Sequence, residues 1–108
     1  MGKMRAMVLS ECAKIETNPL KSTIIDKHQI ERQNEILLKI EACGVCHSQL
    51  HGIEGDWKHI GIPASLPIVP GHEVVGEVIE IGKEVTKFKI GDRAGITPLL
   101  EACKKCQY

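Results

Sequence analysis

A run of alternating residue types leads directly into a cysteine-rich segment. Ile36, Leu38, Ile40 and Ala42 occupy every second position, and Lys and Glu lie among the residues between them. This period of two predicts a β-strand with one strongly apolar face. The strand ends at Cys43, so the fold must deliver the end of a strand into the segment that follows.

The rest of the chain predicts further short strands, Gly turns and one brief helix. We expect strands over residues 4–9, 74–81 and 93–97, with a bulge or tight bend at Gly76. Residues 46–54 fit a short helix ended by Gly55, and the three prolines of residues 61–70 predict a loop. Residues 11–33 are mixed and polar, with a turn at Asn18-Pro19, and we assign them no strand. This pattern predicts a mainly β fold, a small and partly open β-barrel.

Length and charge exclude several classes of function. The 108 residues suffice for one small domain, and 14 basic residues balance 14 acidic ones, which gives no electrostatic reason to bind nucleic acid or an anionic membrane. No apolar run approaches the roughly 20 residues of a membrane span, and the start lacks a secretory apolar region. We therefore expect a cytoplasmic protein, in which five cysteines indicate metal binding or catalysis rather than disulfides.

A cluster of four residues follows the strand predicted over residues 36–42. Their side chains can bind a metal and move protons. If a helix begins at Cys46, the positive end of the helix dipole favours the thiolate that metals bind. His47 shares this helix start, where phosphate groups are readily held. Ser48 and His51 are three apart and share a helix face, so a hydroxyl and an imidazole could form a proton path.

His72 and Glu73 form a second cluster beyond the proline-rich loop. Gly71, which precedes them, permits close approach of the backbone. Zinc binds Cys sulfur and His nitrogen, and a catalytic zinc keeps three protein ligands and one open position. Cys46 and His72, with Glu73 adjacent, are therefore candidate ligands, and the residues alone indicate no third fixed ligand.

Cys103 and Cys106 form a Cys-x-x-Cys pair near the end of the chain, which is half of a structural zinc site. Their separation from Cys46 far exceeds the about 15–20 residues of a zinc ribbon, so one shared four-cysteine site is not expected. The alternative is a pair of surface cysteines beside a basic turn.

Three other interpretations of the first cluster remain open. Cys43 to His47 matches the c-type haem attachment pattern Cys-x-x-Cys-His, which requires export. The same two cysteines match a thioredoxin-like redox pair, which requires a βαβ setting. The residues could also be structural, with buried cysteines and surface histidines.

In combination these motifs resemble the N-terminal portion of zinc-dependent alcohol dehydrogenases, in the medium-chain dehydrogenase/reductase superfamily. The residues that carry the resemblance extend over nearly the whole chain: Cys46-His47-Ser48-x-x-His51, Gly55-Asp56-Trp57, Leu66-Pro67-x-x-Pro70-Gly71-His72-Glu73, Gly91-Asp92-Arg93 and the pair Cys103/Cys106. The resemblance implies a GroES-like domain over residues 1–108.

The resemblance also implies roles at a catalytic centre. Cys46 and His72 are similar to two of three catalytic zinc ligands, and Glu73 to the neighbouring acid that can approach the metal. Ser48 and His51 resemble the relay that carries the alcohol proton to solvent.

Further roles follow from the same resemblance. His47 is similar to the residue that contacts the pyrophosphate of the cofactor, and Trp57 to a wall of the substrate pocket. Cys103 and Cys106 resemble the first two ligands of the structural zinc. The chain departs from the family at Gln49, where an Asp usually orients a zinc-binding His.

The resemblance implies an oxidoreductase that uses zinc and NAD or NADP to interconvert alcohols with aldehydes or ketones, and that forms a homo-oligomer. No Gly-x-Gly-x-x-Gly fingerprint occurs between Met1 and Tyr108. A third catalytic ligand, two structural cysteines and a Rossmann domain are therefore expected beyond Tyr108, and the chain alone is expected to be inactive. The alternative is a non-catalytic, zinc-stabilised GroES-like interaction module, which a stop codon after Tyr108 would favour.

Overall fold

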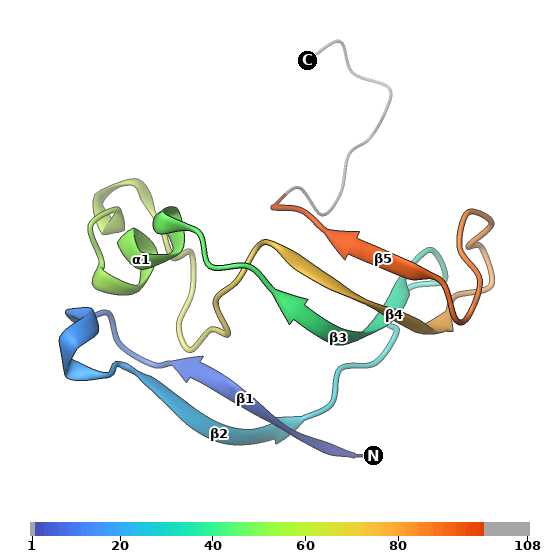
Figure 1. Cartoon of the computed structure of the whole chain (residues 1–108), viewed down its shortest axis with the longest axis horizontal. Helices are drawn as coiled ribbons and strands as arrows, with labels where there is room; N and C mark the ends of the chain where they lie inside the picture. Colours follow the sequence, from blue (N-terminus) through green and yellow to red (C-terminus); the bar gives the residue numbers. More distant parts are fainter. Residues whose placement is uncertain (1, 99–108) are drawn as a thin grey trace, which may run out of the picture.

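The computed structural model describes residues 2–98, which form two antiparallel sheets and short helical segments (Figure 1). One sheet pairs β1 (Lys3–Leu9) with β2 (Leu20–Asp26). The other has the order β3 (Ile36–Cys43), β4 (Val74–Ile81), β5 (Arg93–Ile96). The helical segments are α1 (His47–Glu54) and the 3₁₀ turns η1 (Ile15–Thr17) and η2 (Lys58–Ile60). Within residues 2–98, no helix combines the length and apolar character needed to cross a bilayer.

The predicted fold class is confirmed: residues 2–98 are mainly β with one short α-helix. The two sheets are open and do not close into a barrel. The strands expected at residues 4–9, 36–42, 74–81 and 93–97 all form, with ends that move by at most one residue. The helix expected at residues 46–54 begins at His47, and Cys46 is its N-cap.

The expectation that residues 11–33 contain no strand was wrong, because β2 lies there. β2 pairs along its whole length with β1, from Lys3 opposite Asp26 to Leu9 opposite Leu20. Most of its side chains are exposed on both faces. The strand is therefore held by backbone pairing with β1 and shows no alternation of apolar residues that a sequence pattern could reveal.

Few side chains of residues 2–98 are fully buried, and one of them lies where β1 meets the loop before β4. Leu9, at the end of β1, is 1% exposed, and Val78 in β4 is completely buried. Leu9 exchanges two backbone hydrogen bonds with Ile68, at 2.8 and 2.9 Å. These bonds tie the end of β1 to the segment that leads into β4.

The segment after β1 also holds α1 in place. The Ala13 N–H donates to the Ile53 carbonyl at 3.2 Å, and the Ile15 N–H donates to the Glu54 carboxylate at 2.9 Å. Ile53 itself is 4% exposed. Gly55 ends the helix in the left-handed conformation, with φ of 81°, which glycine adopts without steric cost.

The expected irregularity at Gly76 is present in the pairing of β3 with β4. The register shifts between Ile40 and Ala42, opposite this glycine. A Cβ at Gly76 would overlap the Lys39 carbonyl of the neighbouring strand. The pairing then continues to Cys43 opposite Val74, which brings the chain after β3 beside the chain before β4.

The buried position of Leu9 makes a test of this arrangement. We expect Leu9→Ala to lower the free energy of unfolding by about 2–5 kcal/mol, because it leaves a cavity where β1 meets the loop before β4. Ile24→Ala is the matched control, since Ile24 is 64% exposed, and it should change stability by less than about 0.5 kcal/mol. Urea denaturation followed by circular dichroism measures both. Equal effects of the two substitutions would contradict the assignment of Leu9 to the core.

Candidate metal centre

The candidate centre forms where β3 leads into α1 and meets the segment before β4. Cys46 caps the helix N-terminus in an extended conformation, with φ of −100° and ψ of 144°. The Gly44 N–H donates to the Glu73 carbonyl at 2.9 Å, which extends the β3–β4 contact by one step. A Cβ on Gly44 would overlap the Glu73 carboxylate, which would have to move away from its present position.

Three potential metal donors converge at this point. Among residues 2–98, Cys46, His72 and Glu73 each offer one ligand atom, and these atoms lie within 4.8 Å of one another. Cys46 and His72 are half-buried, and Glu73 is exposed. Thiolate, imidazole and carboxylate are all zinc ligands, so this donor set fits zinc.

Ser48 lies between two of these donors. Its hydroxyl donates to the Cys46 sulfur at 3.1 Å and is 3.3 Å from Nε2 of His72. The direction of the second hydrogen bond depends on which His72 nitrogen carries the hydrogen. The Ser48 hydroxyl therefore contacts two of the three candidate metal donors.

The surroundings of Cys46 favour its thiolate. The hydroxyl of Ser48 is the largest cause that lowers the pKa of the Cys46 thiol, followed by the Ser48 backbone N–H and the His72 side chain. Burial and the negative charge of Glu73 oppose this change, and the net direction of the pKa is downward. The thiolate is the form that binds metal, so the hydrogen bonds of Ser48 prepare this ligand.

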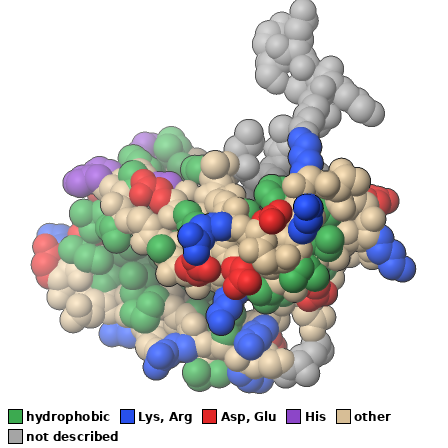
Figure 2. All heavy atoms as spheres, turned by 45° about the vertical axis from the view of Figure 1, so that its right-hand side comes forward, with side chains coloured by type: hydrophobic (Ala, Val, Ile, Leu, Met, Phe, Trp, Pro, Cys, Tyr) green, Lys and Arg blue, Asp and Glu red, His purple; other side chains and the backbone are tan. Residues whose placement is uncertain are grey.

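His51 lies further along α1 and has a carboxylate partner. Its Nδ1 is 2.8 Å from Oδ2 of Asp56, and its ring stacks on Trp57 with centroids 5.0 Å apart and planes inclined by 27°. The ring of His47 is 4.8 Å from that of His51. His side chains gather at the end of the molecule where α1 lies (Figure 2). The sequence grouped His51 with Ser48 and gave no role to Asp56.

Asp56 could have been found from its place in the sequence. It follows Gly55, which predicted the end of the helix, and a residue just past a helix C-terminus turns back toward the last helical turn. Asp56, which directly follows Gly55, is therefore within reach of His51. The sequence alone contains this signal.

The other site predictions have different outcomes. Trp57 packs against His51. Gln49 has a buried side-chain oxygen with no hydrogen-bond partner among residues 2–98. Cys43 is exposed and is not one of the three converging donors. Cys103 and Cys106 lie outside the described residues.

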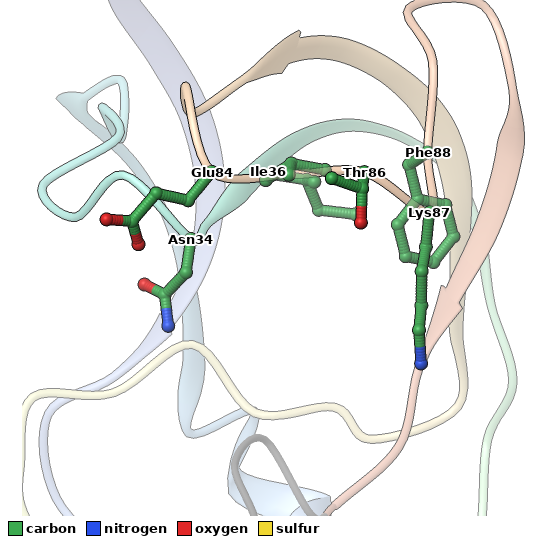
Figure 3. A pocket seen from close by; sticks show the side chains of 7 residues that line it. Asn34, Ile36, Glu84, Thr86, Lys87 and Phe88 are labelled. Atoms are coloured by element: carbon green, nitrogen blue, oxygen red, sulfur yellow. The ribbon is translucent and has the colours of Figure 1, made fainter.

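A surface hollow of about 250 Å³ lies apart from this centre (Figure 3). It is lined by Ile36, the first residue of β3, and by residues of the turn after β4, including Glu84 and Phe88. The candidate metal donors follow the opposite end of β3, so the hollow does not belong to their site.

Comparison with known proteins places the chain in a family. Residues 32–108 match the model of the alcohol dehydrogenase GroES-like domain. An alcohol dehydrogenase of Geobacillus stearothermophilus is 45% identical over 105 residues, which cover 97% of this chain and 29% of that protein. The chain thus spans less than a third of the length of this relative.

Solved structures show the same fold. The zinc-dependent alcohol dehydrogenase 2 of Streptococcus pneumonia, in its apo form, is 29% identical with a TM-score of 0.74, covering 97% of this chain and 27% of that one. The CAD protein of Helicobacter pylori, solved with NADP(H), is 32% identical with a TM-score of 0.72, covering 96% and 28%. The chain therefore belongs to the alcohol dehydrogenase GroES-like domain family.

The role of Ser48 in setting the state of Cys46 can be measured. We expect Ser48→Ala to raise the pKa of the Cys46 thiol toward the ordinary range, because it removes the hydroxyl that lowers it most. In metal-free protein, the rate of Cys46 alkylation by iodoacetamide should then rise at higher pH than in the wild type. Mass spectrometry of the Cys46 peptide gives this rate as a function of pH. Thr23→Ala removes a hydroxyl bonded elsewhere and serves as the control; equal pH profiles for the two variants would reject the assignment.

Proposed function

We propose that residues 1–108 form the GroES-like, zinc-binding part of a longer enzyme that interconverts alcohols with aldehydes or ketones. NAD or NADP would accept and return the hydride. One observation carries this proposal: Cys46, His72 and Glu73 converge within 4.8 Å, and the Ser48 hydroxyl contacts the first two. The activity named for the Geobacillus relative supports the reaction class, and NADP(H) in the Helicobacter structure supports the cofactor class.

Cys46 and His72 would hold the catalytic zinc, with Glu73 close enough to approach it. Zinc, when bound, supplies Lewis-acid polarisation of the substrate oxygen. The further ligand that a catalytic zinc site requires would come from another part of the longer protein. Cys103 and Cys106 would contribute half of the ligands of a second, structural zinc.

Ser48 would accept the substrate proton. Its Oγ lies at the metal donors, so an alcohol oxygen held there comes within hydrogen-bond reach. Ser48 would pass a proton outward along α1 toward His51, which is three residues further on and partly exposed to solvent.

His47 and Trp57 would contact the other groups of the ternary complex. His47 is exposed in the first turn of α1, where helix N–H groups point toward an anion. This position supports contact with the cofactor pyrophosphate. Trp57 presents one face to His51, and its remaining surface is available to a small substrate.

Several exposed apolar side chains support packing against further protein. Val45, beside Cys46, is 91% exposed, Ile60 is 61% exposed and Ile40 is 53% exposed. Side chains of this size usually contribute to stability when they are covered. A cofactor domain in the longer protein would cover part of this surface.

The ligand role of Cys46 gives the first test of the proposal. In the longer enzyme, Cys46→Ser should lose one of two zinc ions per chain together with all measurable alcohol oxidation, because a hydroxyl binds zinc poorly. Cys43→Ser is the matched control, since Cys43 is exposed and lies outside the donor group. Elemental analysis and NAD(P)H absorbance report the two quantities. Full zinc content in an active Cys46→Ser enzyme would refute the assignment.

The isolated chain gives the second test. Purified residues 1–108 should reduce neither NAD nor NADP with ethanol or benzyl alcohol, because no Gly-x-Gly-x-x-Gly turn for a dinucleotide lies in them. The longer enzyme under the same conditions is the positive control. Alcohol-dependent NADH or NADPH formation by the isolated chain would show that this domain assignment is wrong.

A further inference from the structure

The structure joins His51 to the turn after α1 by two hydrogen bonds from one residue. The Asp56 side chain bonds Nδ1 of His51 at 2.8 Å, and the Asp56 backbone N–H donates to the His51 carbonyl at 3.0 Å. Gly55, in its left-handed conformation, turns the chain back so that both bonds can form. A single residue therefore holds both the backbone and the ring of His51.

We propose that Asp56 is a positioning residue that fixes the ring of His51 in the tautomer able to receive the alcohol proton. This inference rests on the function proposed above. A carboxylate can only accept a hydrogen bond, so the shared hydrogen belongs to Nδ1 of His51. A neutral imidazole with its hydrogen on Nδ1 carries its lone pair on Nε2. Nε2 is thereby left as a proton acceptor.

Two further contacts set the plane of the ring. Trp57 stacks on His51 with centroids 5.0 Å apart, and the ring of His47 lies 4.8 Å away at an interplanar angle of 58°. The Asp56 bond selects Nδ1 as the nitrogen that faces the turn, and the aromatic neighbours restrict rotation of the ring about its Cβ–Cγ bond. The ring is thus held in orientation although its side chain is 37% exposed.

The proton balance of this arrangement is simple. The substrate hydroxyl gives its proton to Oγ of Ser48, whose own proton passes through water to Nε2 of His51. The imidazolium that forms releases one proton to solvent through its exposed edge. Asp56 keeps its hydrogen bond throughout and gains no proton, so it acts through His51 and does not itself touch the substrate.

Asp56→Asn tests the tautomer. An amide can donate a hydrogen bond to Nδ1, which moves the ring hydrogen to Nε2 while the ring keeps its place. We expect nitrogen-15 NMR of the 108-residue chain to show the Nδ1–H form of His51 in the wild type and the Nε2–H form in Asp56→Asn. Asp26→Asn removes an exposed carboxylate that pairs with Lys3 and should leave the His51 signals unchanged.

Kinetics of the longer enzyme test whether Asp56 contributes to the reaction by positioning His51. Asp56→Asn should lower kcat by about 10- to 100-fold, because water can partly replace His51. Loss of a group that transfers the proton directly should lower kcat by about 100-fold or more. KM and zinc content should stay unchanged, added imidazole buffer should restore part of kcat, and Asp26→Asn should match the wild type. A structural role of Asp56 would instead lower the melting temperature and leave the buffer dependence unchanged.

Distinct results overturn distinct claims. An Nε2–H form in the wild type, or a tautomer that Asp56→Asn does not change, overturns the positioning of His51. A reversed tautomer with unchanged kcat overturns its part in the reaction. If the longer protein oxidises no alcohol at all, the proposed function fails, and the NMR result separately decides whether Asp56 fixes the ring.

Discussion

The antiparallel pairing of β3 with β4 is the interaction on which the candidate centre depends. It sets Cys43 opposite Val74, and the bond from Gly44 to Glu73 continues the contact toward α1. The metal donors come from segments on either side of a long loop, so only this register brings them together. Slippage by one residue would turn alternate side chains to the other face and separate the donors. The fully buried Val78 in β4 opposes such slippage, since it would have to leave the core.

The charges at the centre oppose one another in a way that suits a cation. The negative charge of Glu73 disfavours the Cys46 thiolate, while the donors of Ser48 and the side chain of His72 favour it. The hydrogen bonds outweigh the effect of Glu73, and the pKa of the Cys46 thiol falls. A divalent ion would interact favourably with thiolate and carboxylate together and remove their mutual repulsion. Ser48 therefore favours the thiolate of Cys46, the form that would bind such an ion.

The sequence predicts those features that depend on local patterns and misses those that depend on pairing across the chain. Alternation predicted β3, and Gly55 predicted the end of α1. β2 was missed because its side chains are mostly exposed and only its hydrogen bonds to β1 define it. The donors Cys46 and His72 were predicted from residue type and resemblance, but their convergence and the contact of Ser48 with both required the β3–β4 register. The unpaired oxygen of Gln49 was beyond prediction, since it depends on burial.

The position of α1 links this chemistry to a part of the chain that contributes no reactive group. The inward side of the helix start carries Ser48, and its last turn carries His51, so both move with the helix as one rigid element. Backbone and carboxylate bonds from Ala13 and Ile15 hold the end of that helix, and Leu9 ties the preceding strand to the loop before β4. A change in this N-terminal segment would therefore displace α1 relative to β4. The distance between Ser48 and the candidate metal donor His72 would then change. The precision of the centre comes from ordinary backbone hydrogen bonds some distance from it.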